Sequence, residues 1–247
     1  MMNWRQVGEL WLLEPPQAKG RLEFIGGSGL GTSPQLSYRR LLEALAQQGW
    51  AVQAWPFVPG FDHQLLAVQA WRAFRRQQER QGPGIRLPTL RLGHSMGCKL
   101  QLLAPDQGRG CGGCGLISFN NFAAGRSIPL LGELAPRLGV TTEFSPSPAE
   151  ALRLIETSYG PPHNLVIRFR SDELDQSAQL FEALQRRPQD DSQWLELAGD
   201  HLTPASAGLR QQFLGGLGDG GRQRQLERLA SAITQWWERL NSLRSSR

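Results

Sequence analysis

The sequence predicts one α/β domain over residues 1–247, in which helices cover both faces of a twisted, mostly parallel sheet. Two observations predict this class. Short β-rich segments alternate with segments of helical periodicity along most of the chain, and this alternation is typical of a parallel sheet. The chain has 247 residues, 40% of them hydrophobic, which is enough to fill a single core of this kind.

The expected strands are short runs rich in apolar and β-branched residues. In order, they span about 6–13, 21–25, 51–57, 89–92, 115–119, 165–169 and 194–197, and the first two form a hairpin-like pair. Charged residues interrupt some of them, and an unpaired buried charge is costly. We therefore expect Glu23 to pair with Arg91, and Arg168 with Glu196, on adjacent strands. The alternative is that these side chains reach water past the covering helices.

The expected helices carry apolar residues at helical spacing. In order, they span about 34–48, 62–81, 96–103, 149–157, 176–187 and 222–240. Asp62 and His63 stand where the second of these helices begins. In the last helix one apolar stripe indicates core packing rather than a lipid-binding face. The stripe consists of Leu226, Leu229, Ile233, Trp236, Trp237 and Leu240.

From about residue 120 to residue 162 the alternation is interrupted, which predicts a small cap insertion. Residues 128–134 could form a short amphipathic helix, and Ser147 is the expected cap of the helix over 149–157. A cap of this kind would supply apolar walls and exclude water from the site beneath it. Because the insertion is short, we expect a modest pocket.

Residues 93–97 read Gly-His-Ser-Met-Gly and lie between an apolar run and a helix-like stretch. In that context the pattern is typical of a nucleophile elbow, a turn so sharp that Ser95 takes a strained backbone conformation. A Cβ at either flanking glycine would collide with the neighbouring strand or helix. The Met96 N–H would then be one donor of an oxyanion hole. An ordinary helix start is the alternative interpretation.

The elbow predicts a carboxylate and then a histidine further along the chain. Of the four histidines, His94 lies inside the elbow, His63 precedes the serine, and His163 begins a strand. His201 remains, in a loop that follows an expected strand and precedes Pro204. We therefore expect Ser95 Oγ to lie within hydrogen-bond reach of His201 Nε2.

Three carboxylates compete for the place beside the histidine, and all follow the expected strand 165–169. Asp172 stands where a loop leaving the strand would direct a side chain back towards His201. Asp175 fits better as the N-cap of the next helix, and Glu173 is expected to face water. We favour Asp172 over Asp175 as the acceptor of the His201 Nδ1–H.

The glycine-rich loop 26–31 follows an early strand, where the second oxyanion donor is expected. We assign that donor to the N–H of Gly27. A dinucleotide-binding loop is excluded because Thr32 stands where a third glycine is needed and no acidic residue ends strand 51–57. A P-loop is excluded because neither Lys19 nor Lys99, the two lysines, lies in a Gly-Lys-Ser/Thr sequence.

These stretches resemble the α/β-hydrolase superfamily over nearly the whole chain. More narrowly, the chain resembles the domain-of-unknown-function 1350 family of photosynthetic bacteria and plants. The matching segments are 24–27, 93–99, 171–176 and 199–204. The resemblance implies an α/β-hydrolase fold with a catalytic triad of serine, acid and histidine, and it brings no substrate. Ile25 departs from the superfamily pattern, which usually has histidine there.

Composition limits the remaining function classes. The net charge is +5 with a pI near 9.7, yet no nucleic-acid motif accompanies the arginines, so no nucleic-acid partner is expected. No apolar run is long enough for a transmembrane segment or signal peptide, and a cytoplasmic location is expected, with weak membrane-surface association open. Cys111 and Cys114 are interpreted as the lead into a strand. No cofactor or metal is expected.

The predicted function is hydrolysis of a carboxylic ester or thioester through an acyl-enzyme on Ser95. The substrate would be a small acyl compound, and the oligomeric state is open. Two alternatives remain: a non-catalytic α/β-hydrolase-fold module that binds a small ligand or a protein, and a basic protein that docks on membranes or RNA.

Overall fold

The centre of the structure is a sheet whose four central strands are buried along their whole length. The computed structural model describes residues 2–82, 87–124, 143–205 and 219–245. The eight strands lie in the order β1-β2-β4-β3-β5-β6-β7-β8. They are β1 (Arg5–Val7), β2 (Leu10–Leu13), β3 (Gly20–Ile25), β4 (Trp50–Trp55), β5 (Thr89–His94), β6 (Gly113–Ile117), β7 (Asn164–Phe169) and β8 (Gln193–Leu197).

The sheet is mixed but mostly parallel, as predicted. From β4 to β8 all neighbours are parallel, while β2 runs antiparallel to both β1 and β4. The expected hairpin-like pair of 6–13 with 21–25 is therefore wrong. The hairpin is β1 with β2, and it turns at Gly8, whose φ of 59° suits glycine. β3 lies instead between β4 and β5.

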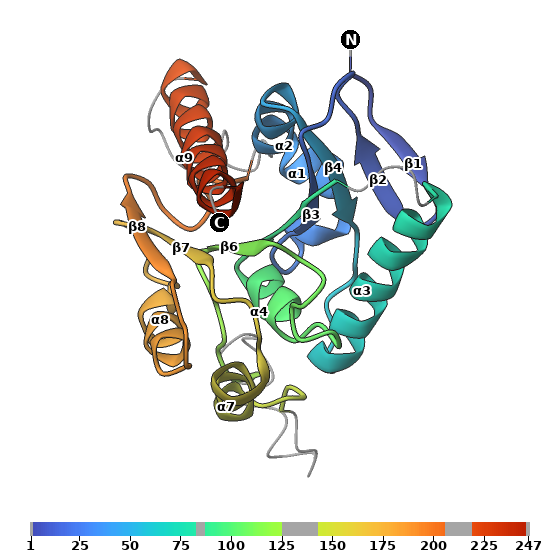
Figure 1. The fold of residues 1–247 in the computed structure, drawn as a ribbon. Helices are drawn as coiled ribbons and strands as arrows, with labels where there is room; N and C mark the ends of the chain where they lie inside the picture. The colour runs from blue at the N-terminus through green and yellow to red at the C-terminus, as the bar shows by residue number, and fades with distance from the viewer. Residues whose placement is uncertain (1, 83–86, 125–142, 206–218, 246–247) are drawn as a thin grey trace.

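Helices cover both faces of the sheet (Figure 1). One face carries α1 (Pro34–Ser37), α2 (Arg39–Gln47) and α9 (Asp219–Ser245). The opposite face carries α3 (His63–Arg80), α4 (Met96–Leu102), α7 (Pro148–Ser158) and α8 (Ser177–Gln185). None of the helices described here is both long and apolar enough to cross a bilayer.

The helix boundaries differ from the expected ones at two places that matter for the site. The helix expected over 34–48 is divided at Tyr38, whose φ of −119° is not helical. The helix after β7 has Gln176 as its N-cap residue, so Asp175 is not the cap. Ser147 does cap α7, and it forms a capping box with Glu150. The expected helix over 128–134 lies outside the described residues, and the cap insertion stays a prediction.

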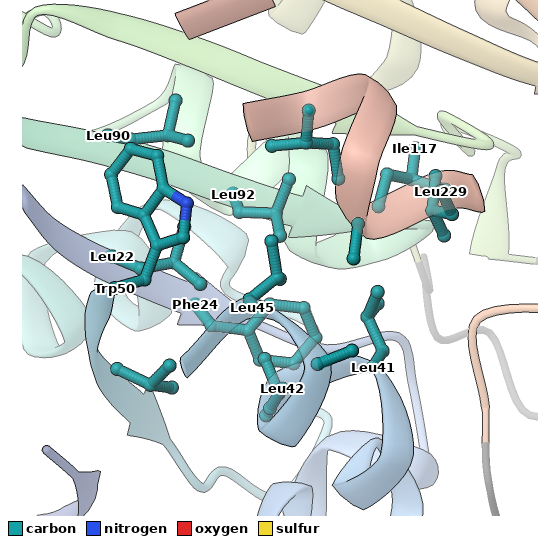
Figure 2. Packing of buried hydrophobic residues seen from close by; sticks show 14 of the residues in the cluster. Leu22, Phe24, Leu41, Leu42, Leu45, Trp50, Leu90, Leu92, Ile117 and Leu229 are labelled. Atoms are coloured by element: carbon teal, nitrogen blue, oxygen red, sulfur yellow. The ribbon is translucent and has the colours of Figure 1, made fainter. Parts of the chain in front are cut away.

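The main core fills the space between the sheet and the pair α2 and α9. Figure 2 shows Leu22, Phe24, Leu90 and Leu92 of the sheet packed against leucines of α2 and against Leu229. The predicted stripe of α9 is buried throughout. Each such side chain contributes about 1.5–3 kcal/mol relative to an exposed one. This core fixes β3 and β5 as neighbours, which sets the two loops that border the site.

One of the two expected charge pairs forms. Arg91 Nε lies 3.2 Å from Glu23 Oε2, and both side chains are buried between β3 and β5. The guanidinium also donates two hydrogen bonds to Asp106, at 2.9 and 2.7 Å. The pair therefore leaves neither charge isolated, which an ion pair inside a protein requires.

The pairing of Arg168 with Glu196 is wrong, although the two residues are register partners on β7 and β8. Glu196 accepts a hydrogen bond from Arg170 at 3.0 Å. Arg168 Nε instead lies 3.9 Å from Asp175 Oδ2. Arg170, in the turn after β7, thus pairs with Glu196 in place of Arg168. Arg168 lies near Asp175 instead.

Candidate active site

Ser95 stands at the turn from β5 into α4, in a backbone conformation that side chains rarely adopt. Its φ is 55° and its ψ is −122°. Such a conformation costs of the order of 1–3 kcal/mol and persists only where the surroundings impose it. A hydrogen bond from the Ser95 N–H to the Ile117 carbonyl oxygen, at 2.9 Å, ties the turn to the end of β6. The elbow predicted from the sequence is therefore present.

The two flanking glycines make the turn possible, for the steric reason expected from the sequence. A Cβ on Gly93 would lie 2.6 Å from the backbone of Cys98 in α4. A Cβ on Gly97 would lie 2.1 Å from the carbonyl oxygen of Ile25 in β3. Both distances are far below van der Waals contact, so the tight packing of helix against strand requires glycine at both positions.

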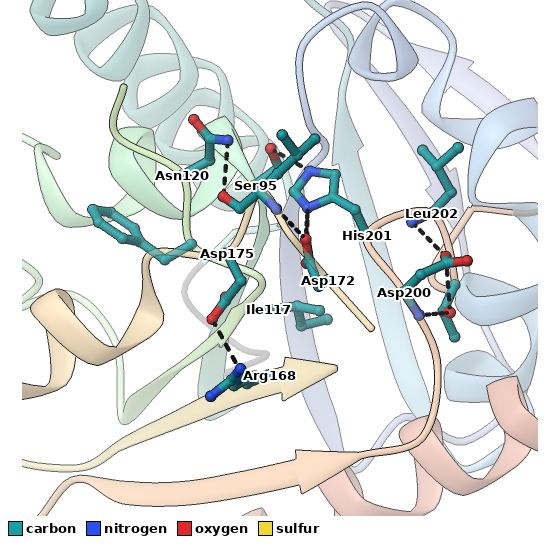
Figure 3. A network of polar contacts seen from close by, with 12 residues as sticks. Ser95, Ile117, Asn120, Arg168, Asp172, Asp175, Asp200, His201 and Leu202 are labelled. Carbon is teal, nitrogen blue, oxygen red and sulfur yellow. Dashed lines mark hydrogen bonds and ion pairs between the residues drawn. The ribbon is translucent and has the colours of Figure 1, made fainter. Parts of the chain in front are cut away.

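A chain of hydrogen bonds runs from the serine through the histidine to the aspartate (Figure 3). Ser95 Oγ lies 3.0 Å from His201 Nε2, and His201 Nδ1 lies 2.9 Å from Asp172 Oδ2. Both contacts are those expected from the sequence. Because the carboxylate can only accept, His201 carries its proton on Nδ1 and leaves Nε2 free to accept the serine proton.

The three side chains come from three loops at the same edge of the sheet. Ser95 follows β5, Asp172 follows β7, and His201 follows β8. The loop of His201 is tied by the Asp200 N–H, which donates to Thr203 Oγ1 at 2.8 Å. Since the carboxyl ends of parallel strands meet at one edge, residues far apart in the sequence converge there.

The environment of Asp172 keeps its carboxyl group ionised. Burial, the largest single influence, would raise its pKa, but the hydrogen bond and charge interaction with His201, together with other hydrogen bonds, outweigh burial and hold the pKa below its usual value. A further hydrogen bond from the Leu174 N–H, at 2.9 Å, acts in the same direction. Asp175, in contrast, is bonded to Ser177 Oγ and has a raised pKa, chiefly because it is buried.

A second buried chain of hydrogen bonds links three parts of the site. The Gly27 N–H donates to Tyr38 Oη at 2.8 Å, and Tyr38 Oη lies 2.8 Å from His94 Nδ1. His94 Nε2 lies 2.9 Å from the backbone oxygen of His201. A carbonyl oxygen only accepts, so His94 is protonated on Nε2 and accepts the Tyr38 hydroxyl proton at Nδ1. Burial lowers the pKa of His94 to about 3, which keeps the ring neutral.

This chain corrects one sequence-based assignment. The Gly27 N–H is taken by Tyr38, so it does not serve as the second oxyanion donor. The next residue, Ser28, lines the pocket beside Ser95, and its N–H has no hydrogen-bond partner among the residues described here. Met96 opens α4, so its N–H has no acceptor within the helix. The two candidate donors are therefore Met96 and Ser28.

A cavity of about 350 Å³ opens over Ser95. This volume is near the lower end of the roughly 300–1,000 Å³ usual for ligand pockets, in line with the modest pocket expected. Its floor is the elbow with His201. Its apolar walls are Leu30, Phe122, Phe144, Leu174 and Leu202. Among the described residues, no cluster of His, Cys, Asp and Glu could hold a metal ion.

Comparison with known proteins places residues 3–236 in a family described as protein of unknown function (DUF1350). The chain belongs to that family. The narrower resemblance drawn from the sequence is thus confirmed. No curated protein matches the sequence.

Solved structures of hydrolases share the fold. An esterase from Pyrococcus furiosus has a TM-score of 0.62 at 13% identity, over 96% of this chain and 93% of the esterase. A dienelactone hydrolase from Anabaena variabilis has a TM-score of 0.56 at 20% identity, over 97% and 96% of the two chains. A thioesterase domain from the curacin biosynthetic pathway has a TM-score of 0.52 at 13% identity, over 85% and 97%. The protein has the α/β-hydrolase fold.

Sequence reasoning missed three residues that border the site. Tyr38 lies 56 residues from His94, and no motif connects them. The sequence assigns His63 only to the start of a helix, and Lys99 only to the matching segment 93–99, as a lysine outside a P-loop. The feature that could have pointed to Lys99 was its place in the helix directly after Ser95, α4, in which every residue is buried.

Proposed function

We propose that the protein is a serine hydrolase that cleaves a carboxylic ester or thioester through an acyl-enzyme on Ser95. The observation that carries the proposal is the hydrogen-bonded chain from Ser95 through His201 to Asp172 at the floor of the cavity. The strained conformation of the serine supports it, because strain of this kind concentrates at functional sites.

In the proposed mechanism, His201 Nε2 takes the proton of Ser95 as Oγ attacks the carbonyl carbon. Asp172 holds the ring in the required tautomer and stabilises the imidazolium that forms. The N–H groups of Met96 and Ser28 bind the developing oxyanion, and the loss of one such donor typically lowers turnover about a hundredfold to a thousandfold. His201 then protonates the leaving alcohol or thiol, and activates a water that hydrolyses the acyl-enzyme.

We favour an ester or thioester over an amide as the substrate, by analogy with solved structures that share the fold. The structures that share the fold include one named an esterase and one named a thioesterase domain. Their sequence identities to this chain are low, so they support the reaction class and carry no information on the acyl group.

Covalent labelling with a fluorophosphonate tests the proposal. The intact protein is expected to gain one phosphonyl adduct on Ser95, located by mass spectrometry of the digested protein. Ser95→Ala abolishes the adduct, and Asp172→Asn slows its formation by roughly three to four orders of magnitude. Asp175→Asn is the matched control, since this nearby carboxylate lies outside the chain of hydrogen bonds to Ser95. A folded protein that remains unlabelled would instead indicate a non-catalytic binding module.

A further inference from the structure

Lys99 is a buried cation close to Ser95. It lies on α4, one turn beyond Met96, and is 1% exposed. Its ammonium group can donate three hydrogen bonds, and its one acceptor among the described residues is the carbonyl oxygen of Pro146, at 3.1 Å. Burial lowers the pKa of Lys99 to about 8, against the opposite influence of the Glu143 carboxylate, so the charged form still predominates at pH 7.

His63 lies on the same cavity and has no hydrogen-bond partner among the residues that the structure describes. The ring is 3% exposed, and neither Nδ1 nor Nε2 is bonded. It stacks on Phe144, with ring centroids 4.2 Å apart. Burial, followed by the positive charge of Lys99, lowers the pKa of His63 to about 4. At pH 7 the ring is therefore neutral and offers one N–H donor and one acceptor.

A purely structural role accounts for only part of this arrangement. Lys99 anchors the segment before α7 through Pro146 and lies 5.8 Å from the centre of the Phe144 ring. That anchor uses one of three ammonium protons, and the stacking of His63 uses neither ring nitrogen. Unpaired polar groups that are buried to this degree cost free energy unless a partner arrives. Both side chains line the cavity that holds Ser95 and His201, so the partner can come from a bound substrate.

We propose that Lys99 and His63 form a subsite for a carboxylate carried by the ester or thioester substrate. The inference rests on the proposed hydrolysis at Ser95 and names its substrate class. Lys99 would donate a charge-assisted hydrogen bond to one carboxylate oxygen and His63 a neutral one to the other. The two side chains supply one positive charge, which the nearby Glu143 carboxylate partly offsets, so the subsite matches a singly charged carboxylate better than a doubly charged phosphate.

Binding is tested without catalysis, on Ser95→Ala protein with ¹⁵N-labelled lysine. The chain has two lysines, so the side-chain NMR spectrum holds two lysine signals, and Lys19→Met assigns them. Addition of adipate is expected to shift the Lys99 signal and to raise the pH at which it titrates. Lys19, on the surface beside Glu238, is the internal control and should not respond. Absence of a response at Lys99, or a response to inorganic phosphate but not to adipate, overturns the carboxylate subsite.

Substrate preference gives a second test. Mono-4-nitrophenyl esters of glutarate, adipate and suberate are compared with the same esters capped by a methyl group, which removes the charge. For at least one chain length we expect kcat/KM to favour the charged ester by about tenfold or more, mostly through KM. Lys99→Met should abolish this preference, Lys99→Arg should retain part of it, and His63→Phe should weaken it. Circular dichroism checks that each variant is folded.

The two proposals can fail separately. Labelling of Ser95 by a fluorophosphonate, with no response to adipate and no preference for charged esters, overturns the subsite and leaves the hydrolase. A response to adipate at Lys99 with no labelling of Ser95 overturns the hydrolase and leaves an anion-binding cavity.

Discussion

The hydroxyl oxygen of Tyr38 bonds two buried polar groups, and the stability lost when that hydroxyl is removed can be calculated. Its side chain is 0% exposed, and burial raises its pKa, so the hydroxyl keeps its proton. In Tyr38→Phe the N–H of Gly27 and Nδ1 of His94 both lose their partner, and water cannot reach them readily. Each unsatisfied buried group costs about 1–3 kcal/mol, so the free energy of unfolding should fall by about 2–6 kcal/mol.

The other tyrosine of the chain provides the matched control. Tyr159 is also buried, and its hydroxyl donates one hydrogen bond, to Asn164 Oδ1 at 2.9 Å. Asn164 is the first residue of β7, at the opposite end of that strand from the loop that carries Asp172. Tyr159→Phe therefore leaves one acceptor unsatisfied and should cost about 1–3 kcal/mol. Urea unfolding followed by tryptophan fluorescence measures both losses.

The two variants should also differ in reactivity at Ser95. Without the Tyr38 hydroxyl, the His94 ring loses the hydrogen bond at Nδ1 that holds it in place, so the hydrogen bond from its Nε2–H to the backbone of His201 should loosen. We expect slower fluorophosphonate labelling in Tyr38→Phe and an unchanged rate in Tyr159→Phe. A loss of stability below about 2 kcal/mol in Tyr38→Phe, or an unchanged labelling rate in that variant, would refute the reasoning.

Three further predictions concern the sheet and the carboxylates. Arg91→Met leaves the buried Glu23 without its counter-charge and should cost about 3–5 kcal/mol in urea unfolding; a loss below about 1 kcal/mol would show that the pair is dispensable. Gly97→Ala should prevent the elbow from closing against β3 and abolish labelling of Ser95, and full labelling would contradict the steric argument. The carboxyl group of Asp172 has a lowered pKa in the folded protein. It therefore stabilises the folded state at pH values above its unfolded-state pKa, near 3.8, and this stabilisation is lost as the pH falls through its folded-state pKa. Asp172→Asn should thus cost more stability at pH 7 than at pH 3, whereas Asp175→Asn, whose parent pKa is raised, should cost less at pH 7 than at pH 3.

The features that local sterics impose were predictable from the sequence. The elbow requires a strand, two glycines and a helix in immediate succession, and each of these can be read from neighbouring residues. The contacts of Ser95 with His201, and of His201 with Asp172, followed from chain order together with the rule that loops after parallel strands meet at one edge. Neither argument needed the position of any distant side chain.

Features that depend on competition between partners were not predictable. Register placed Arg168 opposite Glu196, but the sequence does not show that Arg170 takes the glutamate while Asp175 draws Arg168 away. The rotation of the peptide group at Gly27 is equally hidden, because it depends on a hydroxyl eleven residues later. Such outcomes depend on small differences in distance that only the folded packing decides.

The placement of Lys99 was predictable from the sequence only in part. Lysine on a surface helix normally extends its charge into water, but α4 lies directly behind the elbow and is buried between the sheet and its neighbouring helices, so it has no face in contact with solvent. A lysine in such a helix must direct its ammonium group to a buried acceptor or to an internal cavity. In this protein it donates to the carbonyl oxygen of Pro146 and lines the cavity that contains Ser95, which the ring of His63 also lines. Under the proposed subsite, a charged residue within one turn of Ser95, on a helix with no exposed face, indicates what the cavity binds.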